Sequence, residues 1–197
     1  MVPGLVLAAG SSSRMGRDKA LLTCGPGSLT FVASVIEALR AGGVDDVLVV
    51  GRPEDDALRE EVDAHRARFV ENPRPQDGQL SSLLAGLNVA DHPGVQAVLT
   101  TPVDLPLIDA RIVATLLEAW STSSAPIVRP VYRGRHGHPV IFSRTVFTDL
   151  RRADPSVGAR SVVNAHAARI LDVDIDDAAV VTDIDTPEDY SRLIGTP

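Results

Sequence analysis

The sequence LVLAAGSSSRMGRDKALL, residues 5–22, joins a short apolar segment to a loop of small and cationic residues. The apolar residues at its start are typical of a buried strand. Ala9, Gly10 and the serines after them lack bulk, so a ligand could approach the backbone N–H groups of the loop closely. Arg14 and Lys19 are spaced to add two cationic contacts to an oligophosphate. The stretch therefore predicts a strand followed by an anion-binding loop, with a solvated surface turn as the alternative.

Two familiar phosphate-binding loops have a different spacing. A P-loop has four residues between its glycines, followed by Lys and then Ser or Thr. In this chain five residues separate Gly10 from Gly16, and Arg17 and Asp18 follow. The dinucleotide fingerprint G-x-G-x-x-G does not fit either, because Gly10 is followed by three serines. The spacing therefore excludes both kinds of loop.

Short apolar segments alternate with longer segments of helical periodicity along the chain. The predicted strands are residues 4–9, 46–50, 95–101 and 125–131. The predicted helices are residues 28–43, 53–69, 78–92 and 109–123. This alternation predicts a parallel or mixed sheet with helices on both faces, and ligands of such sheets bind beyond the carboxyl ends of the strands. Residues 125–175 are less regular, and we expect a hairpin with substrate-facing loops there.

Length and composition restrict the class of protein. A chain of 197 residues suits one domain, residues 1–197. The formal net charge of −7 argues against a nucleic-acid binder and against an anionic membrane surface as a partner. Cys24 is the only cysteine, which fits a reducing compartment. Without a signal-like start or a long apolar segment, we expect a cytoplasmic protein with no membrane contact.

One acidic residue follows a predicted buried strand. In TTPVDLPLI, residues 100–108, Asp104 lies at the carboxyl end of the strand and shortly before Pro106. A carboxylate there could hold a divalent cation, with phosphate oxygens and water completing a magnesium shell. A helix cap or a turn aspartate is the alternative.

A second acidic site lies near the carboxyl end of the chain, in VVTDIDTPEDY, residues 180–190. Asp183 and Asp185 are two residues apart, so on an extended segment they would share one face. Thr186 and Pro187 are typical of the N-cap and first position of a helix. Helix capping does not account for Asp185, which could be the second metal carboxylate.

A pair of histidines flanks Gly137 in GRHGHPVIF, residues 134–142. His136 and His138 could bind a metal, but the sequence near them offers no third ligand. Hydrogen bonding to a substrate, or structural packing, is favoured over a zinc site.

Five motifs in this order resemble the nucleotidyltransferase family that includes the molybdenum cofactor cytidylyl- and guanylyltransferases. They are residues 5–22, DGQLSSLLAGL (77–87), PVDLP (102–106), GHPVIF (137–142) and DIDTPEDY (183–190). The resemblance implies a Rossmann-like, three-layer α/β/α fold with a mostly parallel sheet, similar to nucleotide-diphospho-sugar transferases. It also implies transfer of a nucleoside monophosphate from an NTP to a phosphorylated acceptor, with release of pyrophosphate and with Mg²⁺ as the cofactor.

The resemblance also assigns roles to residues. It implies that Arg14, Lys19 and Asp104 are catalytic, that Asp104 and Asp185 hold the metal, and that His138 lies near the acceptor. The implied nucleotide-binding residues are Leu7, Ala8, Ala9, Gly10, Ser11, Ser12, Ser13, Arg14, Lys19, Gln79, Ser81 and Ser82.

The choice of nucleotide depends on Ala9. Members of the family that use GTP typically have Gly where this chain has Ala9, so the resemblance favours CTP as the nucleotide and molybdopterin as the acceptor, with a client molybdoenzyme as a possible transient partner. Val103-Asp104-Leu105-Pro106 departs from the Gly-Asp-Met-Pro of many cytidylyltransferases. A guanylyltransferase, a transferase acting on another phosphorylated small molecule, and a non-catalytic accessory protein for molybdoenzymes are the alternatives. Residues 151–163 could form a lid over the acceptor.

Overall fold

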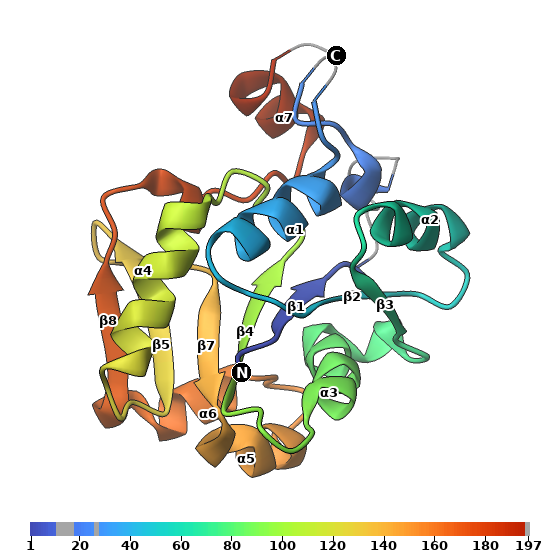
Figure 1. The fold of residues 1–197 in the computed structure, drawn as a ribbon. Helices are drawn as coiled ribbons and strands as arrows, with labels where there is room; N and C mark the ends of the chain where they lie inside the picture. The colour runs from blue at the N-terminus through green and yellow to red at the C-terminus, as the bar shows by residue number, and fades with distance from the viewer. Residues whose placement is uncertain (11–17, 26–27, 196–197) are drawn as a thin grey trace.

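The computed structural model describes residues 1–10, 18–25 and 28–195. Its centre is an eight-stranded mixed sheet in the order β3-β2-β1-β4-β7-β5-β6, with β8 paired to β5 (Figure 1). The strands are β1 (Gly4–Leu7), β2 (Val47–Gly51), β3 (Arg68–Glu71), β4 (Ala97–Pro102), β5 (Ile127–Tyr132), β6 (Arg135–His136), β7 (Val140–Ser143) and β8 (Ile170–Asp174). The helices are α1 (Phe31–Ala41), α2 (Asp56–Ala64), α3 (Gln79–Ala90), α4 (Ala110–Ser121), α5 (Phe147–Arg152), α6 (Arg160–Ala165) and α7 (Pro187–Leu193).

The sheet has a parallel half and a mixed half. Strands β3, β2, β1 and β4 run parallel to one another, so their carboxyl ends meet at one edge. Strand β7 pairs antiparallel with both β4 and β5, and β8 adds a parallel strand beside β5. The direction of the sheet therefore changes next to β4, at the strand that precedes Asp104.

Helices cover both faces of the sheet, as the alternation of apolar segments predicts. Helices α1, α2 and α4 pack on one face, where the core includes Val6 of β1. Helices α3, α5 and α6 pack on the other face, where the core includes Leu5. Because neighbouring residues of β1 enter opposite cores, the strand is apolar without alternation. The predicted three-layer α/β/α fold is confirmed.

Most predicted elements lie close to their predicted positions, but the helix predicted over residues 53–69 is longer than the observed helix α2. Helix α2 ends at Ala64, and Arg68–Glu71 forms the edge strand β3. Arg66, with φ of 54°, reverses the chain between them. The sequence predicts a helix there because the helical pattern of charged residues continues into residues 65–69. The conformation of Arg68–Glu71 is instead decided by the packing of Val70 in the core and by pairing with β2.

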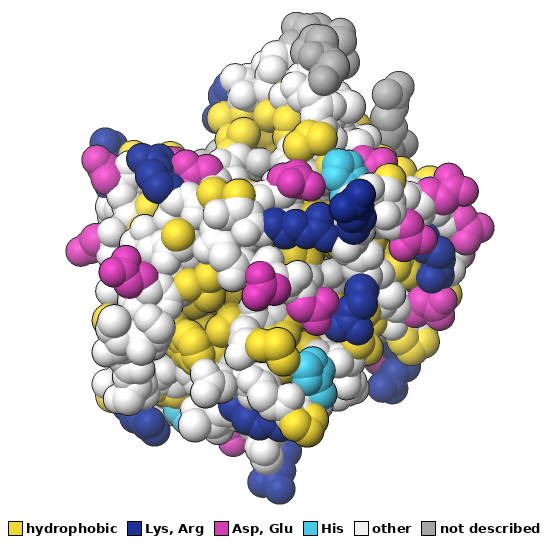
Figure 2. Space-filling model, viewed as in Figure 1, with side chains coloured by type: hydrophobic (Ala, Val, Ile, Leu, Met, Phe, Trp, Pro, Cys, Tyr) yellow, Lys and Arg dark blue, Asp and Glu magenta, His cyan; other side chains and the backbone are white. Residues whose placement is uncertain are grey.

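The hairpin expected within residues 125–175 is confirmed. Strands β5 and β6 pair antiparallel across a turn in which Arg133 and Gly134 both have positive φ. The same region also contains α5, α6 and β8, which the sequence pattern did not reveal. On the face shown in Figure 2, acidic and basic side chains are interspersed, with apolar side chains between them. Within the described residues, no helix is both long enough and apolar enough to cross a bilayer.

Candidate active site

Lys19 lies at the centre of a charged cluster beyond the carboxyl ends of β1 and β4. It begins a 3₁₀ turn, Lys19–Leu21, which Asp18 caps by accepting a hydrogen bond of 3.0 Å from the N–H of Ala20. The Lys19 side chain is largely buried, and its ammonium group is 3.7 Å from a carboxylate oxygen of Asp104. It also donates a hydrogen bond to the carboxylate of Asp185. One cation therefore connects two carboxylates from distant parts of the sequence.

Backbone hydrogen bonds hold these segments together. The N–H of Val103 donates to the carbonyl of Leu7 at 3.1 Å, which ties the segment after β4 to the end of β1. The N–H of Ile184 donates to the carbonyl of Asp104 at 2.9 Å. Ile184 itself is fully buried. The side chains on either side of Ile184 are thereby brought to Asp104, although residues 182–185 form no strand.

Helix α7 anchors the segment that carries Asp185. Thr186 is its N-cap and forms a capping box with Asp189, and Pro187 is its first residue, as predicted. The hydroxyl of Tyr190 donates to the carbonyl of Thr23 at 2.9 Å, and its ring stacks on Phe31 at 6.1 Å between centroids. This docking places the end of the chain beside the segment that contains Lys19.

Asp104 is in an environment that disfavours its charge. Burial raises the pKa of Asp104; Lys19 opposes this effect, and the nearby charges of Asp185 and Asp183 add to it. The pKa stays above its ordinary value even with the ammonium group of Lys19 beside it. A further positive charge close to this carboxylate would offset its repulsion from Asp183 and Asp185.

The loop after β1 is described only to Gly10. Ala8 and Ala9 are buried, and Leu7 lines a cavity. The predicted contacts of Ser11, Ser12, Ser13 and Arg14 lie outside the described residues.

Arg52 supports the loop after β1 and was not found from the sequence. Its Nε–H donates to the carbonyl of Ala9 at 3.1 Å, from just beyond the carboxyl end of β2. A cationic residue directly after a buried strand was the available signal, and it was hidden among the many charges of residues 52–61.

Helix α3 brings Gln79 to the site while its serines serve the scaffold. The buried amide of Asn72 donates to the hydroxyls of Ser81 at 2.8 Å and Ser82 at 3.0 Å. The hydroxyl of Ser81 also donates to the carbonyl of Gly78 at 2.8 Å. The two serine hydroxyls thus fasten α3 to the end of β3, whereas Gln79 lines two adjoining cavities. Sequence reasoning missed Asn72, because the strand β3 that precedes it was not predicted.

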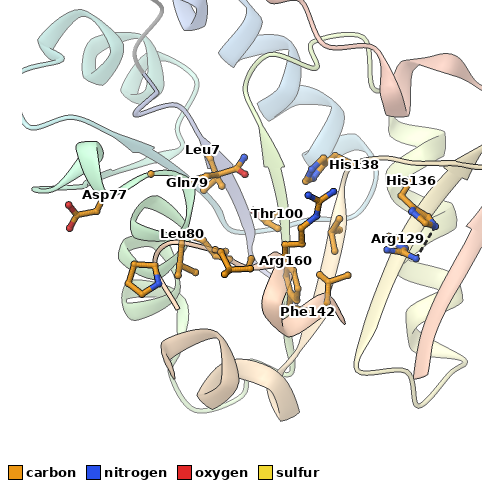
Figure 3. Close-up of a pocket in the computed structure, with 18 of the residues that line it drawn as sticks. Leu7, Asp77, Gln79, Leu80, Thr100, Arg129, His136, His138, Phe142 and Arg160 are labelled. Carbon is orange, nitrogen blue, oxygen red and sulfur yellow. Dashed lines mark hydrogen bonds between the residues drawn. The ribbon is translucent and has the colours of Figure 1, made fainter. Parts of the chain in front are cut away.

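Two neighbouring cavities share part of their lining. The larger has a volume of about 500 Å³ and lies between the sheet, α3 and the segment 155–163 (Figure 3). The smaller, of about 320 Å³, is lined by Asp104 and Asp183. Both are lined by Gln79, His136, Gly137 and His138. A molecule in the larger cavity could therefore extend toward Asp104.

The two histidines have separate surroundings. Burial lowers the pKa of His138, partly opposed by a hydrogen bond to the backbone of Thr100, so the ring is neutral. His136 is exposed and lies beside Arg129, whose guanidinium is 2.9 Å from His136 Nε2 and is also paired with Asp172 (Figure 3). His138 is therefore a buried ring, whereas His136 belongs to an exposed cluster with Arg129 and Asp172.

The donor set suits a hard divalent cation. Asp104 and Asp185 offer carboxylate oxygens, which Mg²⁺ and Mn²⁺ prefer to nitrogen or sulfur. Among the described residues, no group of three or more His, Cys, Asp or Glu side chains could hold a metal ion. A cation at Asp104 would therefore need further oxygen ligands from phosphate and water, as Mg²⁺ commonly does.

The fold and the charged edge of the sheet are those of an α/β protein with a ligand site at the carboxyl ends of its strands. The model of the MobA-like NTP transferase domain matches residues 4–170. The chain belongs to this family.

Relatives within the family transfer different nucleotides, by their names. A molybdenum cofactor cytidylyltransferase of Escherichia coli (strain K12) is 26% identical over 192 residues, which cover 94% of this chain and 92% of the relative. A probable molybdenum cofactor guanylyltransferase of Mycobacterium bovis (strain BCG / Pasteur 1173P2) is 31% identical over 162 residues, covering 79% and 73%. The crystal structure of Rv0371c from Mycobacterium tuberculosis H37Rv in complex with manganese superposes with a TM-score of 0.78 at 24% identity, covering 100% of this chain and 99% of that one.

Proposed function

We propose that this chain transfers CMP from CTP to the phosphate of molybdopterin and releases pyrophosphate. The observation that carries the proposal is the cluster of Lys19, Asp104 and Asp185 beyond the carboxyl ends of β1 and β4. A buried cation and paired carboxylates beside a loop of small residues can receive a triphosphate and neutralise its charge. We assign the activity to residues 1–197 as one cytoplasmic domain, which would pass its product to a molybdoenzyme.

The reaction needs no nucleophilic side chain. An oxygen of the acceptor phosphate attacks the α-phosphorus of CTP in line, the bond between the α-phosphorus and the bridging oxygen breaks, and pyrophosphate leaves with the electron pair. Lys19 offsets charge on the α-phosphate and on the leaving group. Arg14 adds a second cationic contact, and the backbone of Ala8, Ala9 and Gly10 lies against the phosphates.

We propose Mg²⁺ as the cofactor, held by Asp104 and Asp185. When bound, a divalent cation neutralises phosphate oxygens and helps to orient the triphosphate. Two features support such a cation: the pKa of Asp104 is raised, and both proposed ligands are carboxylates, which offer oxygen atoms. The manganese in the similar structure of Rv0371c supports the choice of a divalent metal.

CTP is the proposed nucleotide because Ala9 stands where GTP-using members typically have Gly. The side chain of Ala9 is buried, and its backbone carbonyl is fixed by Arg52. A methyl group at this point narrows the space for a base and favours a pyrimidine over a purine. The similarity to guanylyltransferases keeps GTP as the second candidate, and it is comparable to the similarity to the cytidylyltransferase.

Pyrophosphate release tests the proposal. The purified protein is assayed with Mg²⁺ and CTP, GTP, ATP or UTP, each with and without molybdopterin, and nucleotide binding is followed by thermal shift. Release with CTP that depends on molybdopterin is the expected result. If pyrophosphate is released with GTP and not with the other nucleotides, GTP is the nucleotide substrate and the choice of CTP is wrong. No binding of any nucleotide would refute the proposed role of the site.

A further inference from the structure

The ammonium group of Lys19 lies between the two carboxylates that we propose as metal ligands. It donates a hydrogen bond to Asp185, and it is 3.7 Å from a carboxylate oxygen of Asp104. Only 14% of the Lys19 side chain is exposed, so solvent screens its charge less than it screens a surface lysine. The carboxylates that would coordinate a divalent cation therefore already share a cation that belongs to the chain.

Lys19 is the only lysine of the protein. Lys and Arg together number 19, and all of them except Lys19 are arginine. A guanidinium is a planar fork that binds a carboxylate through two nitrogen atoms, whereas an ammonium group is a compact point charge on a flexible stem. A compact charge can occupy the place of a small cation between two carboxylates, and it can leave that place by rotation about the bonds of its stem.

The backbone on both sides of this contact is held in place. The N–H of Leu22 donates to the carbonyl of Lys19 at 3.1 Å, and Ala20 between them is fully buried. On the other side, the N–H of Ile184 donates to the carbonyl of Asp104 at 2.9 Å. An exchange of partners at this site therefore needs rotation of the Lys19 side chain and no movement of the backbone.

We infer that Lys19 is an internal counter-ion that occupies the metal position until a nucleotide binds. The inference rests on the proposed function, which places a triphosphate beside Lys19 and a divalent cation at Asp104 and Asp185. A cation that binds alone must displace Lys19 and leave a largely buried ammonium group without its carboxylates, which is unfavourable. When a triphosphate is present, its oxygen atoms accept hydrogen bonds from Lys19, and the carboxylates become available to the metal.

The metal and the nucleotide should therefore bind cooperatively. CTP raises the affinity for the metal because it takes up Lys19, and the metal must raise the affinity for CTP by the same factor. A triphosphate without a metal meets an excess of negative charge, since Asp183 lines the same small cavity as Asp104 and Lys19 also pairs with Asp185.

The first test measures the binding of Mn²⁺ alone, from the electron paramagnetic resonance signal of the free ion. Lys19→Met removes the ammonium group and keeps an unbranched side chain. Arg68→Met is the matched control, because it changes the net charge equally at the amino end of β3, where Arg68 pairs with Asp46 at 2.7 Å. Asp185→Asn is also combined with Lys19→Met, and the Tm of each variant shows that it is folded.

Lys19→Met should bind Mn²⁺ at least about tenfold more tightly than the unchanged chain, as expected if no more than about a tenth of the unchanged molecules leave the carboxylates open. Arg68→Met should stay within about twofold of the unchanged chain, because its site is distant and exposed. Adding Asp185→Asn to Lys19→Met should remove the gain, which places the bound ion at the same carboxylates.

The second test follows Lys19 in the unaltered protein. Because the chain has one lysine, carbon-13-labelled lysine gives a single set of side-chain signals in nuclear magnetic resonance spectra. The Cε–Hε signal should stay nearly in place when Mg²⁺ is added alone and should shift when Mg²⁺ and CTP are added together. This measurement needs no variant to fold.

A folded Lys19→Met variant that binds Mn²⁺ no more tightly than the unchanged chain would overturn the inference. So would a Lys19 signal that moves as far with Mg²⁺ alone as with Mg²⁺ and CTP. If Lys19→Met gains affinity through Asp185 while the unchanged chain transfers no nucleotide, the internal counter-ion is supported and the proposed function fails. If the chain transfers CMP while Lys19→Met shows no gain, the function stands and the inference fails.

Discussion

Replacing Asp104 by asparagine should abolish turnover and make the protein more stable at neutral pH. The carboxylate attracts Lys19 across 3.7 Å, worth about 4.5 kcal/mol at an effective dielectric constant near 20. Taking a carboxylate out of water costs several kcal/mol. Since the pKa of Asp104 is raised in spite of Lys19, the cost of burial and repulsion exceeds the attraction. Asp104→Asn removes this excess and should raise the free energy of unfolding by roughly 1 kcal/mol.

Because the pKa of Asp104 is raised in the folded chain, the gain in stability of Asp104→Asn should depend on pH. A raised pKa means that the folded chain binds the proton more tightly than the unfolded chain, so the ionised group lowers stability above the folded pKa. Well below the ordinary pKa of 3.8, at about pH 3 and lower, the carboxyl is protonated in both states, and the variant should lose its advantage. Thermal unfolding in EDTA should show a Tm about 2–4 °C higher for Asp104→Asn at pH 7.5 and nearly equal Tm values at about pH 3.

Asp109→Asn is the matched control, because removing this carboxylate should lower the stability at neutral pH rather than raise it. A backbone hydrogen bond from Ile112 and the neighbouring Arg111 lower the pKa of Asp109, so its charge stabilises the fold above its ordinary pKa and is lost as pH falls. Asparagine also caps helices, so the loss at pH 7.5 should be about 0.5 kcal/mol or less. A lower Tm for Asp104→Asn at pH 7.5, or full activity of that variant, would refute the reasoning about Asp104.

Three further substitutions test the site and its support. Lys19→Met should lower kcat about 100- to 1000-fold in the pyrophosphate assay while CTP still binds, and unchanged kcat would remove Lys19 from the transfer step. Asn72→Ala should lower the free energy of unfolding in urea by about 1–3 kcal/mol, because the hydroxyl of Ser82 loses its partner; an unchanged midpoint would contradict that network. Gly137→Ala would place a Cβ 2.0 Å from the carbonyl oxygen of Val180, so Tm should fall by the equivalent of about 3 kcal/mol, and a native Tm would show that this backbone contact can relax.

The sequence predicts the parts of the fold whose pattern is local. Strand β4 and helix α4 follow from apolar runs and from a capping residue, Asp109, which accepts from the N–H of Ile112 as such caps do. The edge strand β3 and the short helices α5 and α6 have no comparable pattern. Their conformations depend on contacts with distant parts of the chain, such as the pairing of β3 with β2.

The same division holds for the site. Lys19, Asp104 and Asp185 were named separately from the sequence, and the structure brings them together through the hydrogen bond of Ile184 and the docking of Tyr190. Arg52 and Asn72 could not be named, because a lone polar residue after a strand gains meaning only when its partner is known. Ser81 and Ser82 were named as nucleotide contacts, a role that stays a prediction, while their hydroxyls are bonded to Asn72.

Strand β4 contains a buried polar residue, Thr100, whose hydroxyl has no hydrogen-bond partner among the described residues. Val98 and Thr100 lie on the same face of the sheet, two residues apart, and Val98 packs in the core with no polar atom to satisfy. Valine has the shape of threonine, so a strand selected for stability alone would gain from valine at position 100 as well. The hydroxyl of Thr100 is buried without a hydrogen-bond partner among the described residues, and burial raises the pKa of Asp104, so both groups are unfavourable in the free protein. A divalent cation would relieve the penalty at Asp104, so Mg²⁺ with CTP should stabilise the unchanged chain more than Asp104→Asn.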